Sequence, residues 1–294
     1  MNGISQPSAP SIPTRRRFLR RAGQVGLGLF AVGTGTVGYG FYEASQIRVR
    51  RRTVAVPNLP RGFDGTTVAV LADFHHGPFV SLDFLRRAVA LANSLSPDLF
   101  ALVGDFAHKG THTHEQLPPC LAVLAKLRAP LGAFAVPGNH DMGRGGAIYR
   151  EVLAATETVT DVTNRAVPVT RNGETLWLAG VDDLWWGKPD VAAALSKVPT
   201  TAAVLLLSHN PDVAELQPDP RVGLMLSGHT HGGQAYVPGY GPLWLPSRYG
   251  SKYCGGLAAG PASAVFVSRG LGEAGVPLRL NCPPEINLLS LTAS

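Results

Sequence analysis

Residues 222–233 read VGLMLSGHTHGG, an apolar run that passes directly into a glycine-flanked pair of histidines. The run has the length and composition of a buried β-strand, and the glycines allow a tight loop at its end. His229 and His231 are two positions apart, so both imidazoles can face one small volume. Neutral imidazole is the commonest metal ligand among side chains. Alone, the pair fits an exposed turn as well as half of a metal site, so partners are needed elsewhere in the chain.

Four further apolar runs end in the same kind of loop. They predict short strands covered on both faces at residues 67–72, 99–103, 133–136 and 203–207. Helical periodicity lies between strands at residues 81–95, 115–128 and 189–198. In a sheet of strand-helix-strand units the carboxyl ends of the strands meet at one edge, so the polar residues that follow them should converge. These residues are Asp73, His75, Asp105, Asn139, His140, His209, His229 and His231.

The remaining strands complete this pattern. Asn172-Gly173 predicts a hairpin turn between two strands, and the runs 264–267 and 286–289 predict strands that close the sheet. The converging donors are oxygen and nitrogen without a thiolate. That set favours a pair of divalent metal ions such as Mn, Fe or Zn, and it does not distinguish among them.

The polar loops also form five motifs in a fixed order: Asp73-Phe74-His75, Gly104-Asp105, Gly138-Asn139-His140-Asp141, His209 and Gly228-His229-Thr230-His231. Through them the chain resembles the calcineurin-like metallophosphoesterases. The stretches Ser208–Asp212, Gly232–Gln234, Pro246–Gly250 and Cys282–Ile286 look like the bacterial membrane-associated branch of that group. The resemblance covers the chain from about residue 53. It implies an α/β fold, specifically a four-layer α/β/β/α sandwich with two sheets packed face to face.

The resemblance also implies roles for these residues. One metal ion would be held by Asp73, His75, Asp105 and His231, and the second by Asp105, Asn139, His209 and His229, so that Asp105 bridges the two. His140 would stabilise the phosphoryl oxygens or protonate the leaving oxygen, and Asp141 would orient its imidazole. Many relatives have a second acid shortly after Gly-Asp, whereas this chain has Gly104-Asp105-Phe106-Ala107-His108. That difference leaves the surroundings of Asp105 open.

The first 52 residues have a separate character. The sequence from Thr14 to Arg20, TRRRFLR, resembles a twin-arginine export signal, and residues 22–42 are uncharged and include seven glycines. As a helix this run would be about 30 Å long, enough to cross a bilayer. We expect residues 1–52 to be an uncleaved signal anchor and linker, and residues 53–294 to be a catalytic domain outside the cytoplasm. Arg48, Arg50, Arg51 and Arg52 after the run favour the reverse orientation, which stays open.

The distribution of charge along the chain argues against a nucleic-acid partner. Residues 1–52 carry nine arginines and one glutamate, which leaves 17 basic and 19 acidic side chains in residues 53–294. The predicted domain therefore has no basic excess for the phosphate backbone of a nucleic acid, and no nucleic-acid partner is expected. At 45% apolar and 16% charged residues, the chain can bury one large core.

Several other side chains fit either a functional role or an ordinary structural position. His76 and Arg248 are candidates for binding substrate, and Arg269 for binding phosphate, although each fits a solvated or ion-paired position as well. His108, His112 and His114 are expected in an exposed loop at the mouth of the cleft. Trp185 and Trp186 could present aromatic surface to a lipid or sugar, or pack on a sheet edge. Cys254 and Cys282 could pair, but three unpaired thiols (with Cys120) fit the sequence as well.

These features predict metal-dependent hydrolysis of phosphomonoesters or phosphodiesters, with a lipid-linked or sugar-nucleotide-linked phosphate of the cell envelope as the expected substrate. Some relatives in the branch cleave the pyrophosphate of an acylated UDP-glucosamine. Two alternatives stay open: a phosphodiesterase or phosphatase for soluble nucleotides or proteins, and a metal-bound scaffold without turnover. A contiguous apolar patch near Trp185 and Trp186 would favour the lipid.

Overall fold

The computed structural model describes residues 15–293. It comprises two compact units, one ending at Gly40 and one beginning at Phe41, and each is described by itself. The first is part of helix α1 (Arg15–Ala44). Residues 1–14, with the start of the twin-arginine pattern, lie outside the described residues.

Residues 22–42, the predicted membrane span, are helical within α1. No helix among residues 15–293 combines the length and the apolar character needed to cross a membrane.

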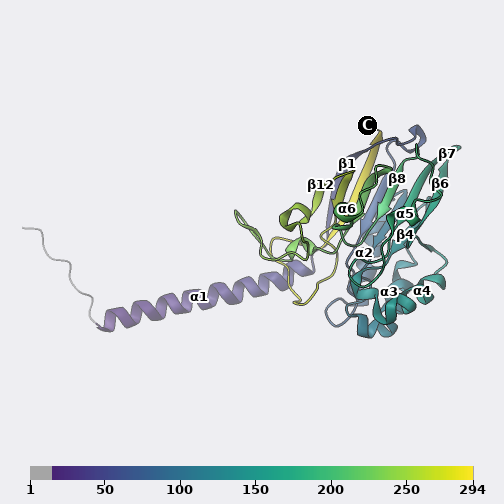
Figure 1. The fold of residues 1–294 in the computed structure, drawn as a ribbon. Helices are drawn as coiled ribbons and strands as arrows, with labels where there is room; N and C mark the ends of the chain where they lie inside the picture. Colours follow the sequence, from purple (N-terminus) through teal and green to yellow (C-terminus); the bar gives the residue numbers. More distant parts are fainter. Residues whose placement is uncertain (1–14, 294) are drawn as a thin grey trace, which may run out of the picture. The chain divides into compact units, whose positions relative to one another are not determined.

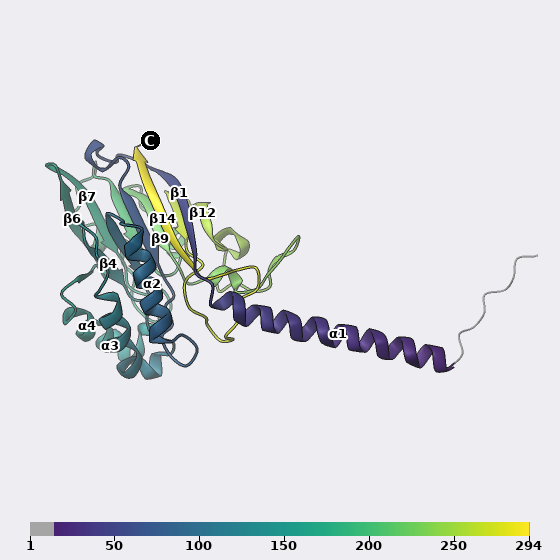
Figure 2. The same cartoon turned by 180° about the vertical axis from the view of Figure 1, so that it is seen from behind.

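The second unit contains two six-stranded sheets (Figures 1 and 2). The first has the order β1 (Arg48–Val56), β14 (Glu285–Ala293), β2 (Thr67–Leu71), β3 (Leu99–Val103), β4 (Ala133–Val136) and β5 (Val159–Asp161). The second has the order β12 (Gly256–Ala259), β13 (Ala264–Val267), β9 (Val222–Ser227), β8 (Val204–Leu207), β7 (Glu174–Gly180) and β6 (Arg165–Arg171). Strands β2 to β5 run parallel to one another, as do β7, β8, β9 and β13.

Alternation within single strands explains why two sheets pack face to face. In β2, Val68 and Val70 belong to the apolar core between the sheets, whereas Ala69 and Leu71 belong to the core beneath the helices. Successive strand side chains point to opposite faces, so a strand that is apolar at every position needs a covering layer on each side. In β8 the same rule sends Leu205 into the space between the sheets and Leu206 to the outer side.

Helices provide the two outer layers. The outer face of the first sheet is covered by α2 (Leu82–Ser94), α3 (Thr113–Leu124) and α4 (Ala147–Ala154), and Figure 2 shows α2 lying across it. The outer face of the second sheet is covered by two single-turn helices, α5 (Val191–Ala194) and α6 (Val213–Leu216). The predicted four-layer α/β/β/α sandwich is confirmed.

Local signals in the sequence account for most element boundaries. Ser81 caps α2 by accepting a hydrogen bond from the Phe84 N–H, so the predicted helix begins where its cap lies. Asn172 and Gly173, both with positive φ, form the predicted hairpin turn between β6 and β7. Strand β1 begins at Arg48, inside the segment that we expected to be linker, and pairs in parallel with β14. A short hairpin of β10 (Tyr236–Val237) and β11 (Gly241–Pro242) follows the His229–His231 loop.

Candidate metal centre

The loops after five strands meet at the carboxyl edges of the two sheets. Asp73 and His75 follow β2, Asp105 follows β3, Asn139 follows β4, His209 follows β8, and His229 and His231 follow β9. The backbone of these loops is sharply bent, because Asp73, His75, Asp105, His229 and His231 all have left-handed φ between 45° and 71°. Non-glycine residues seldom adopt this conformation, and such strain is concentrated at functional sites.

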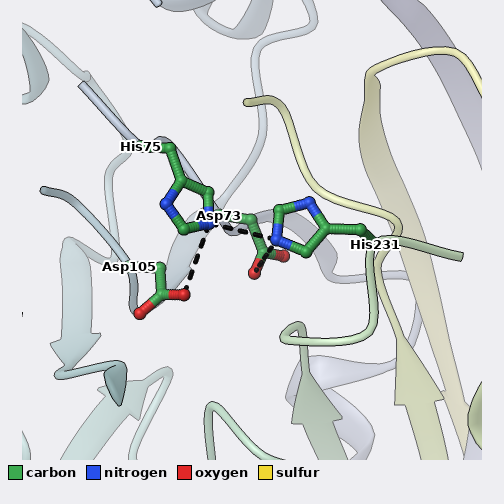
Figure 3. Close-up of side chains that lie close together, drawn as sticks. All are labelled: Asp73, His75, Asp105 and His231. Carbon is green, nitrogen blue, oxygen red and sulfur yellow. Dashed lines mark hydrogen bonds and ion pairs between the residues drawn. The ribbon is translucent and has the colours of Figure 1, made fainter. Parts of the chain in front are cut away.

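Four of these residues form one compact cluster. Asp73, His75, Asp105 and His231 are buried, and one ligand atom from each lies within 4.8 Å of all the others. Figure 3 shows the imidazoles of His75 and His231 facing each other, with the two carboxylates beside them. Their Nε2 atoms are 3.0 Å apart. Asp105 Oδ2 lies 3.4 Å from His75 Nε2, and Asp73 Oδ1 lies 3.4 Å from His231 Nε2. This donor set fits a divalent metal ion.

A second group of donors adjoins the first through Asp105. His209 Nε2 is 3.2 Å from Asp105 Oδ2, the same oxygen that faces His75, and His229 Nδ1 is 3.3 Å from His209 Nε2. His209 donates its Nδ1–H to the carbonyl of Val103 at 2.8 Å, which turns Nε2 toward the site, as in many metal-binding histidines. The geometry therefore places Asp105 between the two groups.

Two buried oxygen atoms in this region have no hydrogen-bond partner among residues 15–293: Asp73 Oδ2 and Asn139 Oδ1. Buried polar atoms are paired in the great majority of folded proteins, so these oxygens need an explanation. Both can donate electron pairs to a cation, and the Nε2 atoms of His75 and His231 face the same cluster, so the residues present fit a metal centre.

The electrostatics of the site differ among its histidines: against the effect of burial, the Asp105 carboxylate raises the pKa of His209 to about 10, whereas the other three rings are shifted the opposite way. Burial lowers the pKa of His75 and His231 well below the usual value and that of His229 to about 3, so these rings are neutral and can act as ligands. Burial also raises the pKa of Asp73 to about 7, and repulsion from Asp105 adds to the rise. Two carboxylates in one buried site repel each other, and a bound cation removes that repulsion.

His140 borders the same site, but its support differs from our expectation. Its backbone N–H donates to Asp105 Oδ1 at 2.8 Å, and its ring donates from Nδ1 to the carbonyl of His108. Because a carbonyl only accepts, Nδ1 carries a proton, and Nε2 is the ring nitrogen that is left to take up or give a proton. The ring centroid of His140 is 4.7 Å from that of His75.

The Asp141 side chain does not orient His140, contrary to our prediction. Its Oδ1 accepts hydrogen bonds from the N–H groups of Phe106 and Ala107, and its Oδ2 accepts from Gly138, all at 2.9 Å. Asp141 thus ties the loop after Asp105 to the loop that carries Asn139. A carboxylate thus lies beside the loop after Asp105, although none follows Asp105 directly in the sequence.

A family model described as calcineurin-like phosphoesterase matches residues 66–233, which hold every residue of both donor groups. The chain belongs to this family. It is 34% identical over 285 residues to the uncharacterized metallophosphoesterase YkuE of Bacillus subtilis (strain 168), with 96% of this chain and 98% of that one covered. It is 34% identical over 229 residues to the phosphodiesterase YaeI of Escherichia coli (strain K12), with 76% and 81% covered. Among solved structures, TT1561 of Thermus thermophilus aligns with a TM-score of 0.48 and 16% identity, over 70% of this chain and 90% of that one.

Two cavities of this metallophosphoesterase meet at Asn139 and His140. The larger, of about 770 Å³, is bordered by the basic side chains of Lys109 and Arg144 and also by apolar ones, namely Met142, Ile148 and Trp186. The smaller, of about 230 Å³, reaches Asp105 and His229 and has a largely apolar wall. The apolar wall comes from three separate loops and includes Trp185, Trp244, Pro246, Val276 and Leu278.

Trp185 and Trp186 do not pack on a sheet edge. Trp185 lies edge-on to the His229 ring, with the centroids 4.4 Å apart, and Trp186 is 70% exposed at the larger cavity. The backbone N–H groups of both tryptophans donate hydrogen bonds to Asp183 Oδ2, which positions this loop. The sequence indicated a surface role for Trp185 and Trp186 but not for Trp244, because no periodicity or motif includes Trp244 itself.

Our expectations for several other side chains need correction. His108 is buried against His75 and Phe79, whereas His112 and His114 are exposed as predicted. His76 Nδ1 is hydrogen-bonded to the Val80 carbonyl, and the backbone N–H of Arg248 donates a hydrogen bond to Asp212 Oδ2. Within the described residues, neither His76 nor Arg248 borders the two cavities.

The three cysteines are free thiols. Cys254 and Cys282 do not pair, because each thiol is directed at a backbone carbonyl of the His231 loop: Cys254 Sγ at Gly232 and Cys282 Sγ at His231.

Proposed function

We propose that this metallophosphoesterase hydrolyses a phosphodiester or phosphomonoester in which the phosphate joins a polar group to an apolar one, such as a lipid-linked or sugar-nucleotide-linked phosphate of the cell envelope. The observation that carries this proposal is that two cavities adjoin at Asn139 and His140, and only the larger has lysine and arginine in its lining, whereas the smaller has a largely apolar wall. A phosphate at the metal centre would have one substituent beside Lys109 and Arg144 and the other against Trp185 and Trp244.

The resemblance to the family and the two adjoining donor groups support the roles proposed for the site residues. The ligands proposed for the first metal ion are Asp73, His75, Asp105 and His231, and those for the second are Asp105, Asn139, His209 and His229. Two divalent ions held by these residues would supply Lewis-acid stabilisation of the phosphoryl oxygens and activation of water. His140, held through Nδ1 by a carbonyl, would present Nε2 to the leaving oxygen or a phosphoryl oxygen.

Apolar surface continues outward from the smaller cavity. Trp185, Trp244 and Val276, which border it, are 48%, 70% and 56% exposed. Exposed apolar groups that are continuous with a binding cavity favour a ligand with an apolar part, and tryptophan suits the boundary between lipid and water. A soluble nucleotide could stack its base on Trp185 or Trp244, but it would leave the aliphatic part of the wall, Val276 and Leu278, without a role.

The first experiment tests hydrolysis itself. Purified full-length protein is assayed with an aryl phosphodiester and an aryl phosphomonoester, with added Mn²⁺ or with chelator. We expect metal-dependent turnover of at least one of them. The absence of turnover on any phosphoester by protein with two bound metal ions would instead favour the non-catalytic scaffold.

The second experiment tests the substrate class. Two phosphodiesters with the same head group, one short-chain and one long-chain, are compared in wild type and in Trp244→Ala. We expect wild type to prefer the long chain at least tenfold in kcat/KM, since burying two CH₂ groups provides about 1.6 kcal/mol. Trp244→Ala should lose much of this preference, and Leu257→Ala, an exposed apolar residue on β12, should keep it. Equal kcat/KM for both chains in wild type would favour a soluble substrate.

We also propose that the protein is exported and works at the outer face of the cytoplasmic membrane. The support is the sequence of Arg15 to Arg20, which fits recognition by the twin-arginine export machinery. Fractionation of cells that express wild type or Arg15→Lys/Arg16→Lys tests it. A catalytic domain that stays inaccessible to external protease in wild type would contradict export.

A further inference from the structure

A basic cleft lies where the two sheets end side by side. Strand β1 is the edge of the first sheet and β12 the edge of the second, and both views of the fold place them next to each other (Figures 1 and 2). A cavity of about 390 Å³ opens between these edges. Its lining includes Arg50, Arg51 and Arg52 from β1, Gly255 and Gly256 at β12, and Arg269 after β13.

The arginines of β1 occupy the face that should carry apolar side chains. Val54 and Val56 point into the core between the sheets, and strand alternation puts Arg50 and Arg52 on that same face. The Arg52 guanidinium reaches the second sheet: a Cβ on Gly256 would lie 3.8 Å from Arg52 Nη2. Charged side chains therefore line the end of the apolar core.

The Arg269 side chain packs beside two glycines. A Cβ on Gly232 would lie 3.0 Å from its Cγ and Cδ, and a Cβ on Gly255 would lie 2.8 Å from its Nε. Both glycines have positive φ, which disfavours any other residue there. The absence of side chains at these two positions therefore leaves room for the half-buried guanidinium beside the cleft.

The cleft has more positive than negative charge. The carboxylate in its lining is that of Glu285. Glu285 Oε1 accepts hydrogen bonds from the backbone N–H of Arg269 and from the side-chain amide of Asn287, and Glu285 Oε2 is 3.9 Å from Arg50 Nε. Among residues 15–293, no ion pair joins the side chain of Arg52 or of Arg269 to a carboxylate. Four arginines against one glutamate leave a net positive charge, and like charges held together create a positive potential in a partly enclosed cleft.

We propose that this cleft binds a phosphate group through Arg52 and Arg269, at a site separate from the metal centre. Guanidinium groups match phosphate oxygens with paired N–H donors and are the usual recognition element for them. The phosphate can belong to an anionic lipid head group or can be free in solution. A lipid source is reasonable because Arg48 to Arg52 closely follow the uncharged segment 22–42 in the sequence.

The test uses metal-loaded full-length protein and two probes. Inorganic phosphate binding is measured by calorimetry, and vesicle binding by co-sedimentation with phosphatidylcholine vesicles with and without phosphatidylglycerol. The variants are Arg52→Gln and Arg52→Gln/Arg269→Gln. The matched control, Arg61→Gln/Arg128→Gln, removes the same charge from exposed positions outside the cleft. Phosphate inhibition of phosphodiester hydrolysis reports the metal centre separately.

We expect Arg52→Gln to weaken binding of at least one probe about fivefold, and the double variant further, because each arginine near a phosphate surface contributes about that factor. The control variant should bind like wild type, and phosphate should inhibit turnover equally in wild type and Arg52→Gln. Loss of the phosphatidylglycerol-dependent vesicle binding identifies the lipid as the source, and loss of calorimetric binding alone identifies free phosphate.

Two results would overturn the proposal: equal weakening in the control variant, or unchanged binding of both probes in Arg52→Gln. Since Arg52 is exposed on an edge strand, its substitution should leave the unfolding temperature near that of wild type. The single variant therefore keeps the test valid even where the Arg269 substitution disturbs folding.

Discussion

Gly138→Ala tests whether the position of Asp105 controls the reaction. A methyl group on Gly138 would overlap Oδ1 and the backbone N of Asp105 and would lie 2.8 Å from its Cγ. Unbonded carbon atoms are normally at least about 3.5 Å apart, so the carboxylate must move by roughly 0.7 Å. Gly138 has φ −107°, which alanine adopts easily, so the effect is steric rather than a backbone strain.

The expected loss follows from that displacement. A misplacement of about 1 Å in an active site can lower the rate about 100-fold, equivalent to about 2.7 kcal/mol of transition-state stabilisation. We therefore expect kcat/KM for an aryl phosphodiester to fall on the order of 100-fold, with a stability loss of about 1–3 kcal/mol from overpacking. The assay is steady-state hydrolysis with saturating Mn²⁺, together with thermal unfolding.

Gly62→Ala is the control, because its added methyl group would meet the flexible end of Glu174, outside the lining of both site cavities. It should retain nearly full kcat/KM. If folded Gly138→Ala protein hydrolyses the diester within threefold of the wild-type rate, the reasoning that Asp105 must stay within a fraction of an ångström is refuted.

Three further predictions concern metal binding, pH and the core. Asp105→Asn and His229→Ala should remain folded but lose turnover and bind less metal, measured by elemental analysis; full activity in Asp105→Asn would exclude a bridging role. Burial raises the pKa of Glu273 to about 7, and Arg279 opposes this rise. The favourable contribution of protonated Glu273 to the free energy of unfolding is therefore present below pH 4.5 and is lost as the pH rises through 7. The unfolding temperature of Glu273→Gln relative to wild type should therefore rise between pH 5 and pH 8, and an unchanged difference would contradict this. Leu205→Ala in the inter-sheet core should lower the free energy of unfolding by about 2–5 kcal/mol in denaturant titration, and a loss below 1 kcal/mol would mean that the sheets repack.

The sequence predicts well which polar side chains converge at the sheet edges, because a strong rule acts at each of them. Strands such as 99–103 are apolar at every position, so they must be buried on both faces, and their ends must share one edge. Helix α2 is equally predictable, since Ser81 caps it and its apolar residues repeat at helical spacing. These features depend on residues that are close together in the chain.

The parts that could not be predicted depend on distant or backbone contacts. Asp141 binds three backbone N–H groups, and no sequence pattern marks a backbone donor as a partner. His108 directly precedes the polar stretch that holds His112, yet it is buried because it packs on His75 and Phe79. Strand β1 has arginines at alternating and successive positions, so it lacks the apolar alternation by which a strand is recognised.

The strained loops at the metal centre link metal binding to folding stability. Five predicted ligands have left-handed φ, at a cost of about 1 kcal/mol or more each, and the total approaches the net stability of a typical domain. Their unpaired buried atoms add to that cost. The two sheets must therefore hold these loops in a conformation that the loops themselves disfavour. A cation bound only in the folded state would offset part of the cost, in proportion to the logarithm of its concentration over its Kd. The same contacts that make the site reactive thus make it the region whose stability depends most on metal, and chelation should lower the unfolding temperature even where no substrate is present.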